Sequence, residues 1–465
     1  MMVFSHRHNS LCVLKRVILL GTICFSLVSC TQPTLVVVTI VPITVDPMVV
    51  TVGIPFEVTR EATRQIIVTQ EVTREVTRQI IATREVEVTR LVPVTITPQP
   101  TSTPIPTPTP RPSPLPTFGS QAPAYTGLWS PAGSMAMSRG WHTATILRDG
   151  RVLIVGGYIA LDKDTTSAEI FDPTTNTFSL TGSLNTARHG HSATLLPDGR
   201  VLVIAGYALG WLSSAEIYDP ATGQWSITQP IFVHGSCHTA TLLKDGRVLV
   251  MAGNTRSGSP GPDDRVEIFD PKTNRWQEAA RHENTSGCHT ATLLPDGRVL
   301  IAGGHADPAI YDPATDTWQP AGKLAISRDE AQAVLLQNGG VLLIGGTDLQ
   351  RETVLNSVEI YDPASNTWRQ AAPLAQARFE HTATLLSDGR ALIVGGYKSI
   401  YGYENVLLDT AEVYDGKSAT SSTLAPLSIG RVIHTATLLP DGRVLVTGGQ
   451  TSRGSFLNSA EVLGQ

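Results

Sequence analysis

The sequence has little cysteine, little charge and no long apolar run. Only five of its 465 residues are cysteine, too few for a disulfide framework. Charged residues make up 16% of the chain and its net charge is −5, so no basic surface for nucleic acid is expected. It contains no nucleophile-elbow, zinc-protease or phosphate-loop motif, so we predict no catalytic residue and no cofactor. The 40 glycines and 31 prolines instead indicate many short strands and turns.

The first residues have the pattern of an export signal. Basic residues up to Arg16 precede an apolar run at 17–28, which is short for a membrane span. The run ends in LVSC at Cys30, which resembles the lipobox of bacterial lipoproteins. That resemblance implies removal of residues 1–29 as a signal peptide and lipid attachment at Cys30. The protein would then be extracytoplasmic and held at a membrane or cell surface by its lipid.

Residues 30–96 are expected to form a stalk. A 14-residue repeat has copies at 57–70 and 71–84. Fourteen residues are two heptads, which slightly favours a coiled coil, although polar residues share its seam. The alternating Val and Thr also suit an extended strand, so both alternatives stay open. A Pro- and Thr-rich linker follows at 97–123 and is expected to form a polyproline II spacer.

The rest of the chain, residues 124–465, consists of repeated units. The stretch HTATLLPDGRVLVTGG at 434–449 has counterparts that begin at His142, His191, His238, His289, Ala331 and His381. In most copies Asp-Gly joins two alternating apolar runs, which is a strong signal for a β-hairpin. A third run such as AEIYD and a fourth run, most often centred on Trp, complete a four-stranded unit. Self-similarity with a period of about 50 residues predicts a β-propeller or a solenoid.

The two ends of the array are complementary. The last unit stops at its third strand, whereas a strand around Trp129 precedes the first unit and belongs to none. We therefore predict an all-β, seven-bladed propeller whose last blade is closed by this N-terminal strand. The Gly-Gly after the second strand, the aromatic in the third and the Trp in the fourth resemble the Kelch repeat. That resemblance implies the same fold, as in the central domain of galactose oxidase, and says little about function.

The loops between the second and third strands vary most, so we predict that they form the binding face. Exposed aromatic rings on such a face suit stacking on sugars or contact with protein side chains. The candidates are Trp141, Tyr158, Tyr207, Trp211, Tyr397, Tyr401 and Tyr403. The alternative is that many of these rings simply pack their own loops.

Five of the seven units carry arginine three residues before the histidine position. They are Arg139, Arg188, Arg328, Arg378 and Arg431. At the start of the innermost strand, they are expected near the mouth of the central channel. In the animal Kelch adaptors that the units resemble, matching arginines bind partner carboxylates, which implies a ligand contact here. The alternative is a structural tie between blades.

Six of the seven units begin with histidine, which favours packing because metal ligands would be needed in only two or three blades. Cys237-His238 and Cys288-His289 occupy equivalent positions in neighbouring units. Buried thiols, a disulfide and a soft-metal site with both imidazoles are the alternatives for these cysteines. Adjacent inner strands are expected to lie too far apart for the disulfide.

The sequence around His434 is also similar to copper-radical oxidases, in which the matching histidine binds copper. Those enzymes also need a Tyr-His pair, and no histidine of this chain follows a tyrosine. Copper is therefore considered but not expected. Asp329 and Glu330, in the unit that lacks the histidine, are a weak candidate for an acid pair at the channel mouth.

The predicted function is recognition of a glycan or an extracellular protein by a lipid-anchored module at the cell surface. One alternative is a secreted enzyme of Kelch type, either a copper-radical oxidase or a sugar-modifying enzyme. Another is a purely structural surface protein.

Overall fold

A computed structural model describes residues 125–232, 237–253, 265–282, 288–304, 306–348, 350–399, 406–452 and 454–464. Before residue 125 it describes only the backbone of four strands. The chain divides into two units, residues 1–107 and 108–465. The predicted coiled coil, the polyproline linker, Cys30, Tyr401 and Tyr403 lie outside the described residues.

The first unit contains a small antiparallel sheet. Its strands follow chain order: β1 (Met2–Phe4), β2 (Cys12–Leu19), β3 (Thr22–Leu27) and β4 (Val38–Ile40). Strands β2 and β3 include most of the apolar run that the sequence assigns to an export signal. Among the described residues, no helix is both long and apolar enough to span a membrane. The signal peptide and its cleavage stay predictions.

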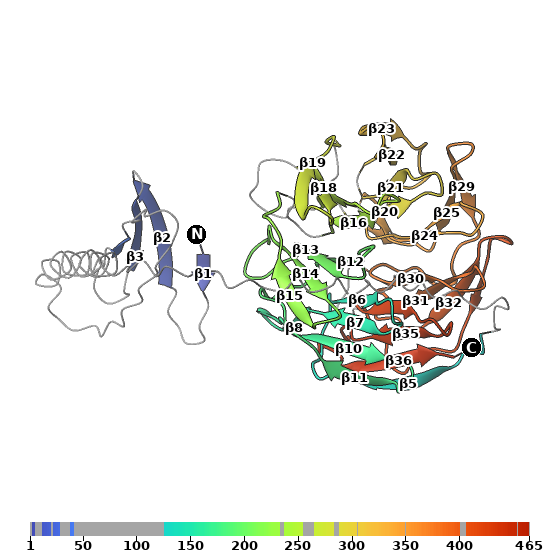
Figure 1. Cartoon of the computed structure of the whole chain (residues 1–465), viewed down its shortest axis with the longest axis horizontal. Coiled ribbons are helices and arrows are strands. Elements are labelled where there is room, and N and C mark those ends of the chain that lie inside the picture. The colour runs from blue at the N-terminus through green and yellow to red at the C-terminus, as the bar shows by residue number, and fades with distance from the viewer. Residues whose placement is uncertain are drawn as a thin grey trace, which may run out of the picture. The chain divides into compact units, whose positions relative to one another are not determined.

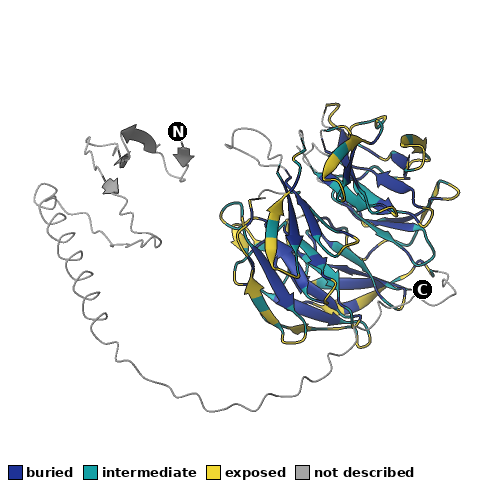
Figure 2. Cartoon of the chain, turned by 45° about the horizontal axis from the view of Figure 1, so that its top comes forward, coloured by how far each residue is buried: buried dark blue, intermediate teal, exposed yellow. Residues whose placement is uncertain are grey.

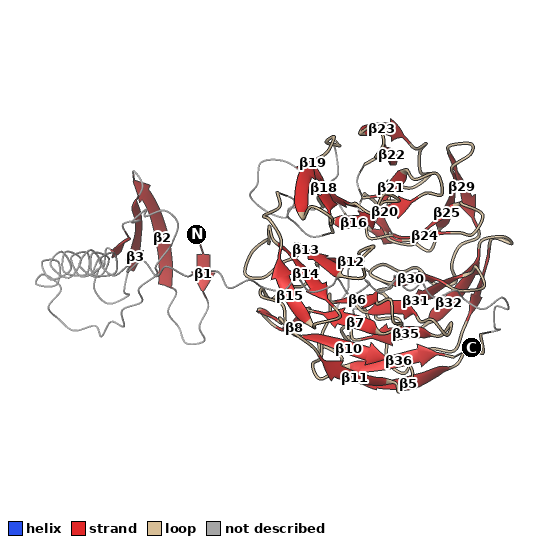
Figure 3. Ribbon diagram, in the orientation of Figure 1, coloured by secondary structure: helices blue, strands red, loops and turns tan. Residues whose placement is uncertain are grey.

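The second unit contains seven four-stranded antiparallel sheets that surround a central axis (Figure 1). From the innermost strand outwards, the first three blades are β6 (Thr143–Ile146), β7 (Val152–Val155), β10 (Ala168–Asp172), β11 (Thr177–Leu180); β12 (Ser192–Leu195), β13 (Val201–Ile204), β14 (Ala215–Asp219), β15 (Gln224–Ile227); and β16 (Thr239–Leu242), β17 (Val248–Met251), β18 (Val266–Asp270), β19 (Arg275–Glu278). Blades 4 and 5 are β20 (His289–Leu293), β21 (Val299–Gly303), β22 (Ala309–Asp312), β23 (Thr317–Pro320); and β24 (Gln332–Leu335), β25 (Val341–Ile344), β28 (Val358–Asp362), β29 (Thr367–Ala371). Blades 6 and 7 are β30 (Thr382–Leu385), β31 (Ala391–Val394), β32 (Ala411–Asp415), β33 (Thr420–Thr423); and β34 (Thr435–Leu438), β35 (Val444–Thr447), β36 (Ser459–Leu463), β5 (Trp129–Ser134). Two short ribbons, β8 (Tyr158–Ala160) with β9 (Lys163–Asp164) and β26 (Thr347–Asp348) with β27 (Thr353–Val354), extend the strand 2–3 loops of blades 1 and 5. The described residues contain strands and loops and no helix (Figure 3).

The ring closes as the sequence predicts. Strand β5 is the outermost strand of blade 7, where Trp129 pairs with Leu463. Each innermost strand contacts the next one, and β34 contacts β6. The all-β, seven-bladed propeller with an N-terminal closing strand is therefore confirmed.

The core lies between the blades, because a single four-stranded sheet leaves both of its faces open. Every residue of each second strand is buried, and those strands run through the dark layers of Figure 2. Val201 and Val203 of blade 2, for example, pack in one cluster with Leu153 and Val155 of blade 1. These near-continuous apolar strands explain why the units cannot be stable singly.

The strand-one histidines join neighbouring blades. The Nε2 atom of His191 lies 2.9 Å from the hydroxyl of Thr143 in the preceding blade. His434 and Thr382 make the equivalent contact at 3.0 Å. Similar bonds link His238, His289 and His142 to Ser192, Thr239 and Thr435. Burial, followed by nearby arginine charge, lowers the pKa of His434 to about 3, so this ring is neutral.

The first glycine of the Gly-Gly pair leaves space for the strand-one histidine of the next blade. A Cβ added to Gly448 would lie 2.7 Å from the His142 ring and 2.5 Å from the Arg139 carbonyl oxygen. Gly448 also has a φ of 60°, which side chains disfavour. Packing between blades therefore explains why the histidine and the glycine pair repeat together.

Candidate binding site on the axial face

The residue immediately before each histidine position surrounds the axis on the strand 2–3 loop face. We call this set the axial ring, and its members are Trp141, Gly190, Cys237, Cys288, Glu330, Glu380 and Ile433. Six of them, all but Cys288, have a φ between 49° and 59°. This left-handed conformation is costly for a side chain as large as Trp, and such strain is concentrated at functional sites.

Backbone hydrogen bonds connect ring positions in successive blades. The amide of Trp141 donates to the Ile433 carbonyl at 3.0 Å, and that of Gly190 donates to Trp141 at 2.9 Å. The amide of Glu330 donates to the Cys288 carbonyl at 3.2 Å. In these three places the residue before the histidine position thus contacts its counterpart in the neighbouring blade directly through the backbone.

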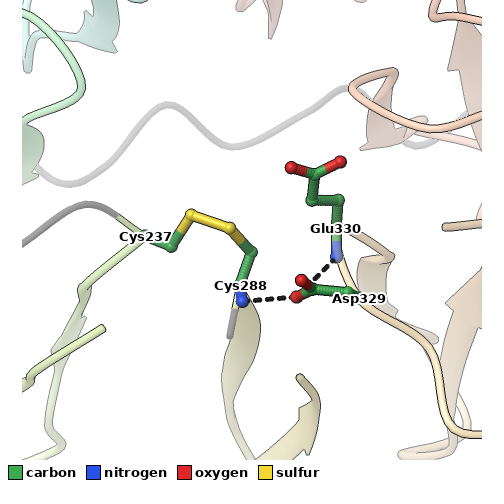
Figure 4. The surroundings of a disulfide bond; sticks show 4 residues. All are labelled: Cys237, Cys288, Asp329 and Glu330. Carbon is green, nitrogen blue, oxygen red and sulfur yellow. Dashed lines mark hydrogen bonds between the residues drawn. A yellow bond between two sulfur atoms is a disulfide. The ribbon is translucent and has the colours of Figure 1, made fainter. Parts of the chain in front are cut away.

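Cys237 and Cys288 form a disulfide across two blades (Figure 4). Their Cα atoms are 4.8 Å apart, well within the range that a disulfide spans. The expectation that adjacent inner strands are too far apart is therefore wrong. Its error lies in treating these cysteines as strand residues, whereas Cys237 has a φ of 59° and precedes its strand.

Two adjoining cavities of about 420 and 400 Å³ open along the axis. Both are lined by Trp141, Glu330, Glu380 and the disulfide. The deeper one continues to the strand-one residues of blades 3 to 5, including Thr239 and Gln332. The outer one, which we call the axial cavity, is also lined by Gly190, His189, Tyr207, Trp211 and Asp329.

Blades 1 and 2 supply an aromatic wall to the axial cavity. Trp141 and Tyr207 are 39% and 37% exposed, so their rings are accessible. His189 lies between them, with ring centroids 5.5 Å from Trp141 and 5.4 Å from Tyr207. Trp211 packs edge-on against Tyr207 at 5.1 Å. His189 is itself held by Asp164, whose carboxylate is 2.5 Å from Nδ1.

Blades 5 and 6 supply an acidic wall. The Asp329 carboxylate accepts hydrogen bonds from the amides of Cys288 and Glu330, while the Glu330 carboxylate points away from it (Figure 4). Burial, followed by repulsion from Glu330, raises the pKa of Glu380 to about 8. Sequence reasoning notices Asp329 and Glu330 but misses Glu380 as a site residue. Glu380 could have been found from the repeat, because it occupies the same position in its unit as Glu330 does in the preceding one.

The five arginines are buried, whereas a ligand contact would need them exposed. None has exposed surface, and each pairs with a glutamate in the third strand of its own blade. The distances are 2.6–2.9 Å for the pairs Arg139–Glu169, Arg188–Glu216, Arg328–Glu359, Arg378–Glu412 and Arg431–Glu461. The Glu169 carboxylate also accepts a hydrogen bond from the amide of Ala136 in the crossing loop. The structure thus gives these arginines the structural role, because a fully buried guanidinium cannot contact a ligand.

Two of the remaining predicted aromatic residues, Tyr158 and Tyr397, pack near the site but do not line the axial cavity. Tyr158 is half-buried, packs on Trp141 and His189, and accepts a hydrogen bond from the amide of Asp162. Tyr397 packs on Phe379 with ring centroids 5.3 Å apart. Neither ring lines the axial cavity, so packing of their own loops describes these two residues better.

The side chains considered for metal binding are engaged in other contacts. Cys237 and Cys288 are joined to each other, and the His238, His289 and His434 rings are bonded between blades. Within the described part of the chain, no three His, Cys, Asp or Glu side chains are grouped so as to hold a metal ion. These residues do not fit a copper centre or a thiolate–imidazole site.

Comparison with known proteins shows Kelch motifs in this propeller. The Kelch motif family model matches residues 143–185, 187–230 and 332–375. Among solved structures, a fungal alcohol oxidase "with catalytic diversity among the AA5 family, in complex with copper" superposes with a TM-score of 0.61. Its sequence is 17% identical, over 73% of this chain and 76% of that one, so the likeness is one of fold. No curated protein matches this chain.

Proposed function

We propose that the propeller is a recognition module that binds a glycan in the axial cavity. The observation that supports this most is the arrangement of Trp141, Tyr207 and Trp211 beside carboxylates around one opening. Sugar rings present apolar C–H faces together with hydroxyl groups. Aromatic faces cover the first and carboxylates accept hydrogen bonds from the second, which is the usual composition of a small-ligand site.

The rest of the chain fits a module of this kind. The lipobox-like stretch at Cys30 and the predicted stalk and linker would hold the propeller away from an extracytoplasmic surface. The axial cavity has a volume of about 400 Å³, which is in the range of small-ligand sites and favours a glycan over a folded protein. An extracellular protein with an exposed loop is the main alternative, and the binding experiment separates the two.

The test is a glycan array probed with the full chain. Trp141→Ala and Trp211→Ala are expected to weaken binding about tenfold or more, because truncation of a central aromatic costs about 2 kcal/mol. Phe232→Ala is the matched control, since that ring is 65% exposed and does not line the axial cavity. Glycan binding that survives both Trp variants, or no glycan binding at all, would refute the proposal.

An oxidase is tested in the same preparation. The full chain is incubated with copper and then assayed for peroxide release from alcohols, aldehydes and sugars. We expect none, because the described His, Cys, Asp and Glu side chains do not fit such a centre. Stoichiometric copper with turnover would replace the recognition module by an enzyme.

A further inference from the structure

We infer that the glycan bound in the axial cavity carries free amino groups, and that Glu330 and Glu380 hold its positive charge against the aromatic wall. The inference rests on the proposed function, because it concerns the same cavity. It adds the charge and the chemical class of the ligand, which the fold does not specify.

The first support is the charge of the lining. Asp329, Glu330 and Glu380 line the axial cavity, and no lysine or arginine is among its described lining residues. The closest arginines in sequence, Arg328 and Arg378, are fully buried and form ion pairs with Glu359 and Glu412. They are therefore committed below the surface and do not neutralise the acidic wall.

The second support is how the carboxylates are used. The Asp329 carboxylate accepts hydrogen bonds from two backbone amides, which fix it against the turn. The side chain of Glu330 extends from the same turn in another direction (Figure 4). Glu380 makes no side-chain hydrogen bond within the described residues and lines both cavities. Glu330 and Glu380 both line the axial cavity and the deeper cavity, so their side chains lie where a ligand on the axis would contact them.

The third support is the aromatic wall of the same cavity. A cation is attracted to the face of Trp or Tyr, and the attraction is larger when water is excluded. An ammonium group on a sugar would satisfy the carboxylates with charge-assisted hydrogen bonds while its ring covers Trp141 or Trp211. A neutral acetamido group at the same position provides no such charge.

Proton release on binding distinguishes a cationic ligand from a neutral one. Burial and, to a smaller extent, Glu330 raise the pKa of Glu380. Burial also raises the pKa of the neighbouring Tyr397, and Glu380 adds to that increase. A bound cation reverses the effect on Glu380 and ionises it. Binding of a cationic ligand at about pH 6 should therefore release a proton, whereas binding of a neutral ligand should not.

The experiment is calorimetry of the full chain with two matched ligands, glucosamine oligomers and N-acetylglucosamine oligomers. At about pH 6 aliphatic amines are protonated, so only the first ligand is cationic. We expect the glucosamine oligomers to bind at least tenfold more tightly, with an affinity that falls as salt is added. Titration in buffers of different ionisation heat should show proton release for that ligand alone.

Variants assign the effect to the two carboxylates. Glu330→Gln and Glu380→Gln are each expected to weaken binding of the glucosamine oligomers about tenfold, and Glu380→Gln should abolish proton release. Glu352→Gln is the control, since Glu352 is exposed and does not line the axial cavity. Equal binding of both ligands, or unchanged binding in both ring variants, overturns the inference but leaves glycan recognition standing. If neither these oligomers nor any array glycan binds, the proposed function fails as well.

Discussion

Two sets of positions run side by side through the propeller and behave in opposite ways. The first set, which we call the repeated set, is the arginine, the histidine and the first glycine of the Gly-Gly pair. These residues are buried and recur in five or more of the blades. The axial ring lies between that arginine and that histidine in the chain, and it holds five different residue types in seven blades. Contacts within and between blades favour the same side chains in most blades, whereas a position that faces the axis is free to differ. On the proposed function, we therefore expect ligand specificity to depend on the axial ring.

The largest effect is expected from breaking the repeated set. Arg378→Ala leaves the Glu412 carboxylate buried without its cation, since both side chains have 0% exposure. Removal of one partner of a buried ion pair costs about 3–5 kcal/mol, which denaturant unfolding would measure. Arg351→Ala is the control, because Arg351 is 70% exposed and should lose less than about 1 kcal/mol. Similar losses in both variants would contradict the buried tie.

The next effect concerns the disulfide, the one covalent link within the axial ring. Its cysteines are 51 residues apart, and a crosslink of this span is worth about 2–4 kcal/mol. The double variant Cys237→Ser, Cys288→Ser should lose about that much, and a reducing agent should destabilise the natural chain but not the variant. Peptide mass mapping without reduction checks the pairing. A natural chain that reducing agent leaves unchanged would argue against the link.

A smaller and pH-dependent effect is expected at Glu380. Its folded pKa of about 8 lies above the ordinary value of 4.5, so its contribution to stability is full below about pH 4.5 and is lost as pH rises through 8. Glu380→Gln cannot ionise, so the variant should melt a few degrees above the natural chain at about pH 9 and level with it at about pH 4. Thermal unfolding across pH measures the difference. A constant offset would mean that Glu380 is not the titrating group.

The smallest effect is a repair of the repeated set. His381 has no hydrogen-bond partner at either ring nitrogen among the described residues, because the preceding blade carries Gln332 where most others have Thr. Gln332→Thr should supply the missing hydroxyl and stabilise the protein by about 1 kcal/mol. Thr382→Ala, which removes the partner of His434, should cost a similar amount. Opposite signs in the two variants would support the inter-blade bond, and equal signs would not.

The sequence predicts the repeated set well and the axial ring poorly. Strand order, blade number and the closing strand follow from apolar alternation and turn residues that recur seven times. The role of the arginines was also available in the sequence. Each of those five units has Glu in the third strand. Of the two units that lack the arginine, blade 4 has Ala309 there and blade 3 keeps Glu267. The pairing within repeats outweighs the family resemblance.

The ring could not be placed because its geometry depends on backbone conformation. Cys237 has a left-handed conformation just before its strand and lies within disulfide range of the next blade. Glu380 has the same conformation and lines the axial cavity. Nothing in the pattern of Cys, Glu or Trp marks a positive φ, since these residues rarely adopt one. Gly190 alone gives that hint, and one glycine is a weak signal.

Gly190 also bears on how such a propeller could acquire new ligands. A Cβ built at this position meets no atom within 4 Å, although its φ is 59°. Asn tolerates that conformation, so an amide could be added to the opening without displacing a neighbour. Single changes at the axis can therefore alter what the protein holds while the seven blades stay as they are.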